Sequence, residues 1–455
     1  MSTTLIRGGG VLTMDAAART IPNGFVLVTD ARITAVGEMA DAPSDWGVNQ
    51  VVDATGCLVT PGLVNMHQHH WYHLLKGVSE GLYLEDWVER VLFPAGQELG
   101  RAEYLASMRL AAADMLLTGT TSFFNHSVTE VSASDVDALA EVSARTGIRQ
   151  FFGKELRARS DLGTPAEHRA GVVDLLTRHP HGVDNLFSVG LAVESGEHWL
   201  RIGAMTPELA GYAAELVRRF DVPVSDHITG GTLFRTVSDF RRREGCGEVQ
   251  WLARNGLLDQ HMLLAHAVWI DDSEILAAAE SGATVVTCPS SGAFTAGGSA
   301  PLRGFAAAGV NVALGSDGPM VNDSVDMLGQ MRECFLLQNA KYLTPAAVPT
   351  SALWEMVTRN AARALGLSGV LGELTPGAVA DIAVFDLSAP RYGGALNPPT
   401  NLILSGGGPD VRWVLVNGQV VVDPAGLVTL DVTEVVEESR DLAHRLATRA
   451  NLLPR

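Results

Sequence analysis

Cysteine is scarce in this chain of 455 residues. The four cysteines are Cys57, Cys246, Cys288 and Cys334, and no two of them have the Cys-x-x-Cys spacing. Neither a disulfide framework nor a cysteine-ligated zinc site is therefore indicated. Four buried thiols in a reducing cytosol are the ordinary interpretation.

Positive charge and long apolar runs are also in short supply. Lys and Arg number 33 against 51 Asp and Glu, which gives a formal net charge of -18. Nucleic acids and anionic membrane surfaces are recognised through basic patches, so neither is expected as a partner, and a small-molecule substrate fits better. No stretch approaches the ~20 apolar residues of a membrane span, and residues 1–7 lack a signal-peptide core. We therefore expect a cytoplasmic protein.

The two ends of the chain share a pattern of short strands broken by turns. Hydrophobic residues make up 47% of the chain, enough for one large domain and a smaller one. We expect residues 1–59 and 367–430 to form a composite β-sandwich domain. Residues 431–455 predict a C-terminal helix, because residues 432–450 are charged with an apolar face of 3.6-residue period.

The central region, residues 60–366, alternates strand-like and helix-like stretches, as repeated βα units do. The eight candidate strands end near His69, His126, Glu155, Glu194, His227, His266, Pro289 and Asp317. Eight such units predict an α/β fold, the (β/α)8 TIM barrel, with chemistry at the carboxyl ends of the strands. In a doubly wound open sheet, the alternative, the polar residues of the first, fifth, sixth and eighth strands would lie far apart.

Four of the histidines and one aspartate at these strand ends are candidates for a metal site. His67 and His69 are one residue apart, so a strand directs both imidazoles to the same face, where they can bind one metal ion. His227, His266 and Asp317 end three later strands. Imidazole and carboxylate ligands suit zinc or iron, whereas calcium and magnesium prefer oxygen.

Several motifs carry a family resemblance that covers nearly the whole chain. They are residues 61–69 (PGLVNMHQH), 74–77 (LLKG), 117–122 (LTGTTS), 315–318 (GSDG), 322–324 (NDS), 360–366 (NAARALG) and 372–381 (GELTPGAVAD). With them the chain resembles the amidohydrolase superfamily, in the branch of the cytosine and guanine deaminases and the s-triazine chlorohydrolases and aminohydrolases.

The resemblance implies a ligand set and a mechanism. His67, His69, His227 and Asp317 would bind one divalent metal ion, with zinc favoured over iron or manganese, and His266 would lie beside the metal-bound water. A cation lowers the pKa of its water toward ~7, so a hydroxide forms at neutral pH and Asp317 can take the proton. His266 would stabilise the developing tetrahedral centre. The family also implies a homodimer or larger homo-oligomer.

One position departs from the family pattern. In deaminases of this branch a glutamate follows the fifth-strand histidine by three residues and protonates the substrate ring, but here that position is Gly230. Loss of such a general acid costs roughly 10²- to 10⁴-fold in rate. Either another acid replaces it or the substrate does not need that proton.

Three charged residues at neighbouring strand ends are candidates for the missing function. Glu194 ends the fourth strand and is the catalytic candidate. Glu155 ends the third strand, where a salt bridge to Arg157 or Arg159 is the alternative. Lys154 could bind an anionic group of the substrate or help to hold a second metal ion.

The loop after the first strand predicts substrate contacts. Trp71, Tyr72 and His73 follow the metal motif, and an aromatic wall suits a flat heterocycle. The alternative for Trp71 and Tyr72 is packing beneath the following segment. Trp87, on a helix-like stretch, and Asn322, behind Asp317, complete the predicted substrate-binding set.

These observations predict a metal-dependent hydrolase that attacks a C–N bond of a small nitrogen heterocycle, by deamination or dealkylamination, with a metal-bound hydroxide. Hydrolysis of a non-aromatic cyclic amide or imide is the alternative, favoured by Gly230. A metal-binding pseudoenzyme is a third hypothesis, and the complete ligand set argues against it.

Overall fold

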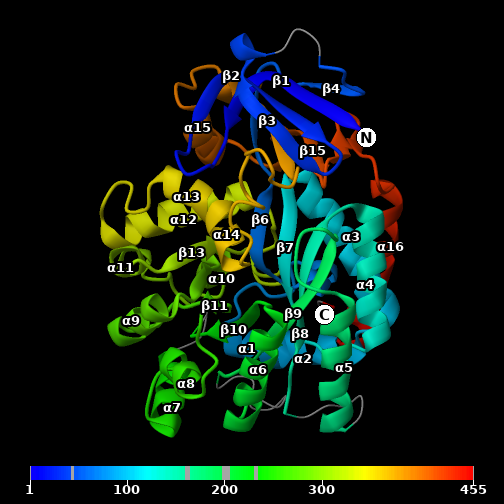
Figure 1. Ribbon diagram of the computed structural model, residues 1–455. Helices are drawn as coiled ribbons and strands as arrows, with labels where there is room; N and C mark the ends of the chain where they lie inside the picture. The colour runs from blue at the N-terminus through cyan, green and yellow to red at the C-terminus, as the bar shows by residue number, and fades with distance from the viewer. Residues whose placement is uncertain (1, 43–45, 159–163, 197–204, 230–233, 454–455) are drawn as a thin grey trace.

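The computed structural model describes residues 2–42, 46–158, 164–196, 205–229 and 234–453. Two sheets organise them. An eight-stranded parallel sheet comes from the middle of the chain, and a nine-stranded mixed sheet is assembled from both ends. In Figure 1 the mixed sheet forms the top of the molecule and the parallel sheet lies below it.

The parallel sheet confirms the predicted barrel. Its strands, each hydrogen-bonded to the next, are β6 (Leu63–Gln68), β7 (Thr120–His126), β8 (Arg149–Glu155), β9 (Phe187–Val193), β10 (Val224–Ile228), β11 (Met262–His266), β12 (Thr284–Thr287) and β13 (Asn311–Leu314). Each ends within three residues of its predicted end. The first and last strands meet where the backbone N–H of Asp317 donates to the carbonyl of His67 at 2.9 Å, so the sheet curls into a near-complete barrel.

Helices surround these strands, as βα repeats require. They are α1 (Leu84–Trp87), α2 (Phe93–Glu98), α3 (Arg101–Leu117), α4 (Ala133–Thr146), α5 (Pro165–Arg178), α6 (Pro207–Phe220), α7 (Phe234–Glu244), α8 (Glu248–Arg254), α9 (Asp272–Ser281), α10 (Pro289–Phe294), α11 (Leu302–Ala308), α12 (Met327–Tyr342), α13 (Thr350–Met356) and α14 (Arg359–Ala364). Local sequence sets their ends. Ser132 and Asp135 form a capping box before α4, and Gly147 ends that helix at a φ of 83°.

The mixed sheet confirms the small β domain built from both chain ends. Its strands are β1 (Thr3–Leu12), β2 (Thr20–Thr29), β3 (Arg32–Glu38), β4 (Gln50–Asp53), β5 (Cys57–Pro61), β14 (Ile382–Asp386), β15 (Val411–Val416), β16 (Gln419–Asp423) and β17 (Gly426–Leu427). The two chain ends join where β5 pairs antiparallel with β14. The domain boundaries at residues 59, 366 and 430 stay predictions.

The mixed sheet lies against the N-terminal ends of the barrel strands. Just before β6, the N–H of Gly62 donates to the carbonyl of Asp381 at 2.9 Å. At the start of β8, the buried guanidinium of Arg149 donates to both carboxylate oxygens of Asp381, at 2.8 and 3.1 Å. The carboxyl ends of the strands therefore face away from this domain.

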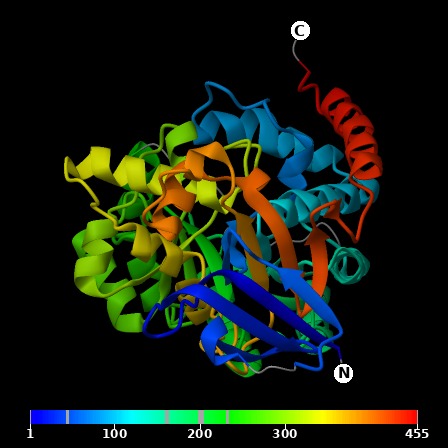
Figure 2. The same ribbon diagram turned by 90° about the horizontal axis from the view of Figure 1, so that it is seen from above.

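Two helices near the C-terminus complete the fold, α15 (Pro398–Ser405) and α16 (Val432–Arg449). Helix α16 packs along α3, where Arg109 pairs with Glu438 at 2.6 Å. Figure 2 shows α16 in red on the outside of the molecule, next to the cyan helices.

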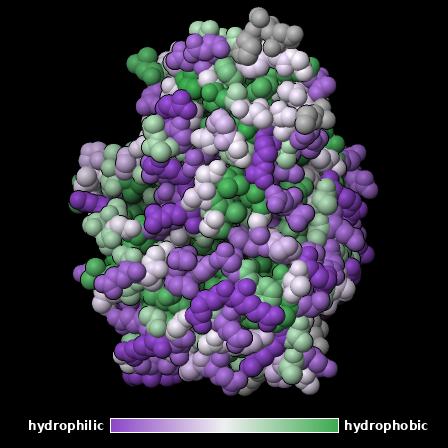
Figure 3. All heavy atoms as spheres, in the orientation of Figure 1, coloured by the Kyte–Doolittle hydropathy of each residue, from purple (hydrophilic) through white to green (hydrophobic). Residues whose placement is uncertain are grey.

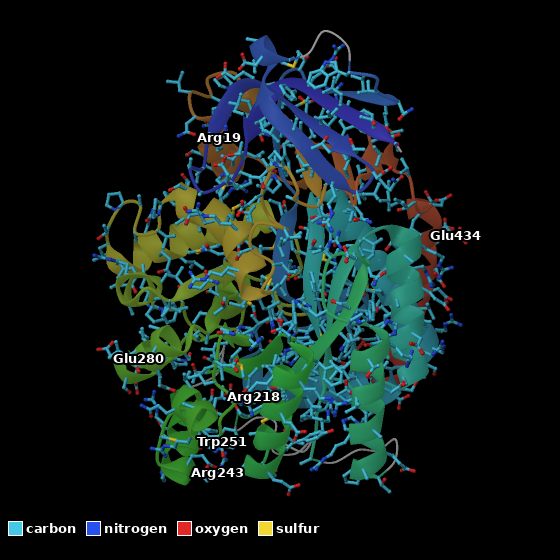
Figure 4. All side chains as sticks on the ribbon, viewed as in Figure 1. Arg19, Arg218, Arg243, Trp251, Glu280 and Glu434 are labelled. Carbon is cyan, nitrogen blue, oxygen red and sulfur yellow. The ribbon has the colours of Figure 1, made fainter. Side chains whose placement is uncertain are left out.

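The surface agrees with the acidic, polar composition. On the face shown in Figure 3, hydrophilic residues predominate and hydrophobic ones occur in separate small groups. Arg19, Glu280 and Glu434 lie exposed at the periphery in Figure 4. Among the described residues, we find no helix that combines the length and apolar character needed to cross a membrane.

Candidate active site

The barrel brings five of the predicted residues to one point at the carboxyl ends of its strands. His67 lies in β6, His227 in β10 and His266 at the end of β11, while His69 and Asp317 follow β6 and β13. His266 and Asp317 have φ angles of 70° and 58°, in the left-handed region of backbone conformation that residues other than glycine rarely adopt. Such strained backbone is common where a strand end must aim a functional side chain.

The separations of the donor atoms fit a single metal ion. Nε2 of His69 lies 3.3 Å from Oδ1 of Asp317 and 3.3 Å from Nε2 of His227, and Nε2 of His67 lies 3.9 Å from the same carboxylate oxygen. Two ligands that each lie ~2.0–2.1 Å from a tetrahedral ion are about 3.3 Å apart. The donor atoms of His67, His69 and Asp317 all lie within 4.8 Å of one another, as do those of His67, His227 and His266, so the two groups share His67 and meet again at the contact between His69 and His227.

His67 gives an independent test of this fit. Its side chain is completely buried, and neither ring nitrogen has a hydrogen-bond partner among the described residues. Its ring lies 4.8 Å from that of His69, 4.9 Å from that of His227 and 5.1 Å from that of His266, between ring centroids. A buried imidazole without hydrogen-bond partners is costly, and a cation bound at Nε2 would satisfy one of its two ring nitrogens.

The environment keeps the imidazoles in the form that binds metal. Burial lowers the pKa of His227 to about 3 and that of His266 to about 4, and burial with the neighbouring imidazoles holds the pKa of His67 well below 6.5. Neutral imidazole offers a lone pair to an ion, whereas imidazolium does not.

Asp317 is held from two sides. Its Oδ2 accepts a hydrogen bond from the hydroxyl of Ser291 at 2.6 Å, and its Oδ1 accepts one from the N–H of Gly318 at 2.8 Å. Burial alone would raise the pKa of this carboxyl, but the hydrogen bond with His69 and the electrostatics of the surrounding imidazoles outweigh it and hold the pKa well below 3.8. Oδ2 also faces His266 Nε2 at 3.9 Å.

Glu194, directly after β9, lies beside the histidine cluster. Nδ1 of His227 is 2.8 Å from its Oε1 and 3.0 Å from its Oε2, and Nε2 of His126 is 3.1 Å from Oε1. Burial raises the pKa of this carboxyl well above 4.5. The structure thus brings Glu194 to the site, in contact with a predicted ligand.

Two residues at the site were missed by the sequence prediction of site residues. His126 was recognised as a strand end, and that position was the signal that could have included it. Ser291 had no such signal, because its contact with Asp317 joins α10 to the segment after β13. Neither contact is visible in the order of residues along the chain.

Tyr72 packs beside His69, and the other two predicted aromatic residues, Trp71 and Trp87, adjoin Tyr72. Trp71 and Tyr72 are each 1% exposed, and the Tyr72 ring lies 4.6 Å from that of His69, between centroids. Trp87 contacts Tyr72 at 5.6 Å, again between centroids. The buried indole nitrogens of Trp71 and Trp87 lack partners among the described residues. A role as a substrate wall stays a prediction.

Lys154 and Glu155 pair with each other. Nζ of Lys154 donates to Oε1 of Glu155 and, at 3.0 Å, to the carbonyl of Val131, and the N–H of Val131 donates to Glu155 Oε1 at 3.1 Å. Arg157 donates instead to the carbonyl of Val128, and Arg159 lies outside the described residues. The pair secures the loop after β7, and its contact with a substrate stays a prediction.

The remaining two predicted substrate contacts have protein partners. Nδ1 of His73 donates to the carbonyl of His70 at 2.9 Å, and its Nε2 lies 3.8 Å from a carboxylate oxygen of Asp114. The side chain of Asn322 donates to the carbonyl of Ser316 and so secures the backbone beside Asp317. Gly230, where the family has its glutamate, lies outside the described residues.

Comparison with known sequences agrees with this geometry. Residues 58–421 match the Amidohydrolase family. A 5-methylthioadenosine/S-adenosylhomocysteine deaminase of Syntrophobacter fumaroxidans is 30% identical over 450 residues, covering 97% of this chain and 98% of that protein. A 5'-deoxyadenosine deaminase of Methanosarcina mazei is 29% identical over 474 residues, covering 99% of this chain and 100% of the other.

Among solved structures, an adenosine deaminase from Xanthomonas campestris with bound zinc has a TM-score of 0.90 and 26% identity. The match covers 98% of this chain and 99% of that one. Because the alignment spans both chains, the barrel and the composite sheet correspond together.

Proposed function

Because this chain belongs to the amidohydrolase family, we propose that it is a zinc-dependent deaminase that hydrolyses the exocyclic C–N bond of an aminopurine nucleoside or a closely related nitrogen heterocycle. The family resemblance and the enzyme class, a hydrolase of non-peptide C–N bonds, are confirmed. The observation that carries the proposal is the buried His67 imidazole, whose ring nitrogens have no hydrogen-bond partner among the described residues and which lies beside three further imidazoles and a carboxylate.

His67, His69, His227 and Asp317 are the residues that would hold the zinc ion. A divalent ion bound there acts as a Lewis acid and lowers the pKa of coordinated water toward ~7. The donor set of three neutral imidazoles and one carboxylate suits zinc, and the solved adenosine deaminase contains zinc. One ion per chain is part of the proposal.

The side chains of the site then move one proton. As water adds to the amino-bearing ring carbon, Asp317 would accept its proton while the adjacent ring nitrogen takes up the electron pair of the C=N bond. That pair re-forms the double bond as Asp317 returns the proton to the amino group, which leaves as ammonia. His266, 3.9 Å from Asp317 Oδ2, hydrogen-bonds the oxygen that adds to the ring. Ser291 holds Oδ2 of Asp317 during the transfer.

The relatives support the substrate class. The two related sequences and the solved structure are named for deamination of 5-methylthioadenosine, S-adenosylhomocysteine, 5'-deoxyadenosine and adenosine. These substrates share a flat 6-aminopurine and differ at the ribose 5' position. Trp71, Tyr72 and Trp87 would form the apolar side of the base pocket.

A second candidate function is favoured by Gly230. A cyclic amide or imide is not aromatic, so its hydrolysis does not require protonation of an aromatic ring, and the missing glutamate would then have no task. Cytoplasmic location and assembly into a homodimer or larger homo-oligomer also remain predictions.

The test is a substrate panel with the zinc-loaded protein. We expect ammonia release from at least one of adenosine, 5'-methylthioadenosine, 5'-deoxyadenosine and S-adenosylhomocysteine. Ring opening of dihydropyrimidines or hydantoins without ammonia release from any aminopurine would instead establish the second candidate. A protein that binds no zinc, iron or manganese and hydrolyses none of these compounds would refute both.

A further inference from the structure

A chain of polar contacts runs from the barrel wall to the proposed metal ligands. Oγ of Ser225 lies 3.0 Å from Nδ1 of His126, Nε2 of His126 lies 3.1 Å from Glu194, and Glu194 lies 2.8 Å from Nδ1 of His227. Three strands, β7, β9 and β10, contribute to it or lead directly into it. We propose that His126 and Glu194 are positioning residues that set the tautomers of the ligands His69 and His227. The inference rests on the proposed metal site.

The tautomer of His227 determines the direction of these hydrogen bonds. If Nε2 of His227 binds the ion, its ring proton is on Nδ1, which faces both oxygens of Glu194. The carboxylate therefore accepts a hydrogen bond from the ligand, the arrangement that orients a metal-binding imidazole and increases its basicity. The charge of a bound cation also favours the ionised form of Glu194, against the effect of burial.

His126 holds Glu194 and a second ligand together. Its Nε2–H donates to the same carboxylate, and its Nδ1 accepts from the Ser225 hydroxyl, so both ring nitrogens are satisfied. The backbone carbonyl of His126 accepts from Nδ1 of His69 at 2.7 Å, which leaves Nε2 of His69 directed at the site. One residue thus orients two of the three histidine ligands.

This arrangement leaves Glu194 poorly suited to replace the general acid. Its carboxylate faces two imidazole N–H donors, and its side chain is 11% exposed. A proton shuttle must bring its carboxyl group to the substrate in order to donate a proton. A carboxylate that accepts two hydrogen bonds from fixed rings is instead held in place. Glu194 therefore acts through His227 and not on the substrate.

The experiment measures zinc affinity, by competition with a chromophoric chelator on the metal-free protein. Glu194→Gln keeps the side-chain volume, but its amide group opposes the N–H of His126 or of His227. We expect zinc affinity to fall roughly 10- to 100-fold in Glu194→Gln and about as much in Glu194→Ala. His126→Gln keeps the backbone carbonyl that supports His69, so a smaller fall of about threefold to tenfold is expected.

The matched control is Glu248→Gln. Glu248 is a buried glutamate whose Oε2 accepts from the N–H of Thr229, beyond the end of β10, and within the part of the chain that the structure describes none of its hydrogen bonds reaches a proposed ligand. We expect its zinc affinity to match wild type. The absorption bands of the cobalt-loaded protein should shift in both Glu194 variants and remain unchanged in the control, because only the Glu194 variants change the hydrogen bonding of the proposed ligand His227.

Three results would overturn the proposal. In the first, both Glu194 variants bind zinc as wild type does; if kcat alone then falls ~10²- to 10⁴-fold, Glu194 acts on the substrate as the general acid. In the second, Glu248→Gln loses as much affinity as Glu194→Gln, which would indicate a general packing effect. In the third, Glu194→Gln leaves the cobalt spectrum unchanged. Failure of wild type to bind zinc would refute the proposed function instead.

Discussion

Replacement of Gly315 by alanine should separate the first and last strands of the barrel at the metal site. Gly315 directly follows β13, and a Cβ added there would lie 2.7 Å from Cβ, 2.9 Å from the backbone nitrogen and 3.0 Å from the carbonyl oxygen of His67. Ordinary contacts begin at 3.4 Å, so the two backbones must part by about 0.7 Å. Asp317 lies two residues further on and His67 is itself a proposed ligand. The displacement therefore acts directly on the ligand geometry.

The expected effect on activity follows from this distance. Catalytic groups tolerate about 0.5 Å of misplacement, and about 1 Å costs on the order of 10²-fold in rate. We expect kcat/KM of Gly315→Ala to fall roughly 10- to 100-fold, together with reduced zinc content at purification. Steady-state kinetics at saturating zinc and metal analysis measure the two effects.

Gly211→Ala is the matched control. Gly211 lies on the exposed side of α6, and nothing stands within 4 Å of an added Cβ. Alanine is the better helix former by ~0.8–1.0 kcal/mol, so this variant should be slightly stabilised with unchanged kcat/KM. A Gly315→Ala protein with full zinc and kcat/KM within about threefold of wild type would refute the geometric argument.

Three further predictions concern the carboxylate of the site, a buried ion pair and a partly buried imidazole. Asp317→Asn should lower kcat by roughly 10³-fold or more with little change in the urea unfolding midpoint, and kcat near wild type would remove Asp317 from proton transfer. Asp381→Asn leaves the buried Arg149 without a charged partner and should lower the free energy of unfolding, measured in urea, by about 3–5 kcal/mol. The exposed Asp441→Asn should lower it by less than ~1 kcal/mol. Equal losses in the two variants would contradict the argument. Hydrogen bonding to Asp259 raises the pKa of His261 to about 8, above the ~6.5 of an unfolded histidine. Its stabilisation is therefore complete below pH ~6.5 and is lost as the pH rises through about 8, so thermal unfolding midpoints of wild type should fall more over this range than those of His261→Gln.

The strand order and the gathering of the site histidines at the barrel rim could be predicted because they depend on local pattern. Each of the eight barrel strands was visible as an apolar run, and parallel strands that close into a barrel place all their carboxyl ends at one rim. His67, His227 and His266 lie in or at the end of their strands, so the barrel brings them to its rim, and the alternation of side chains along each strand decides which residues face the axis.

The partners of those residues could not be predicted in the same way. Glu194 was expected to serve as a catalytic acid because of its place at a strand end, yet its contacts are with His126 and His227, 68 and 33 positions away in the chain. Ser291 reaches Asp317 from a helix that follows a different strand. Hydrogen bonds of this kind require donor and acceptor atoms to be placed to within a few tenths of an ångström, and hydrophobic periodicity does not encode such positions.

By itself, the sequence determined the barrel, the composite sheet and the residue types that gather at the rim, because periodicity and chain order decide which elements form and which strand ends meet. The tertiary structure alone decided which of those residues lie together, which hydrogen bonds hold them in place, and that Trp71 and Tyr72 are buried. The physical reason is that a strand end fixes a direction for a side chain, whereas its hydrogen-bond partner is fixed only when three or four strands pack around the same axis.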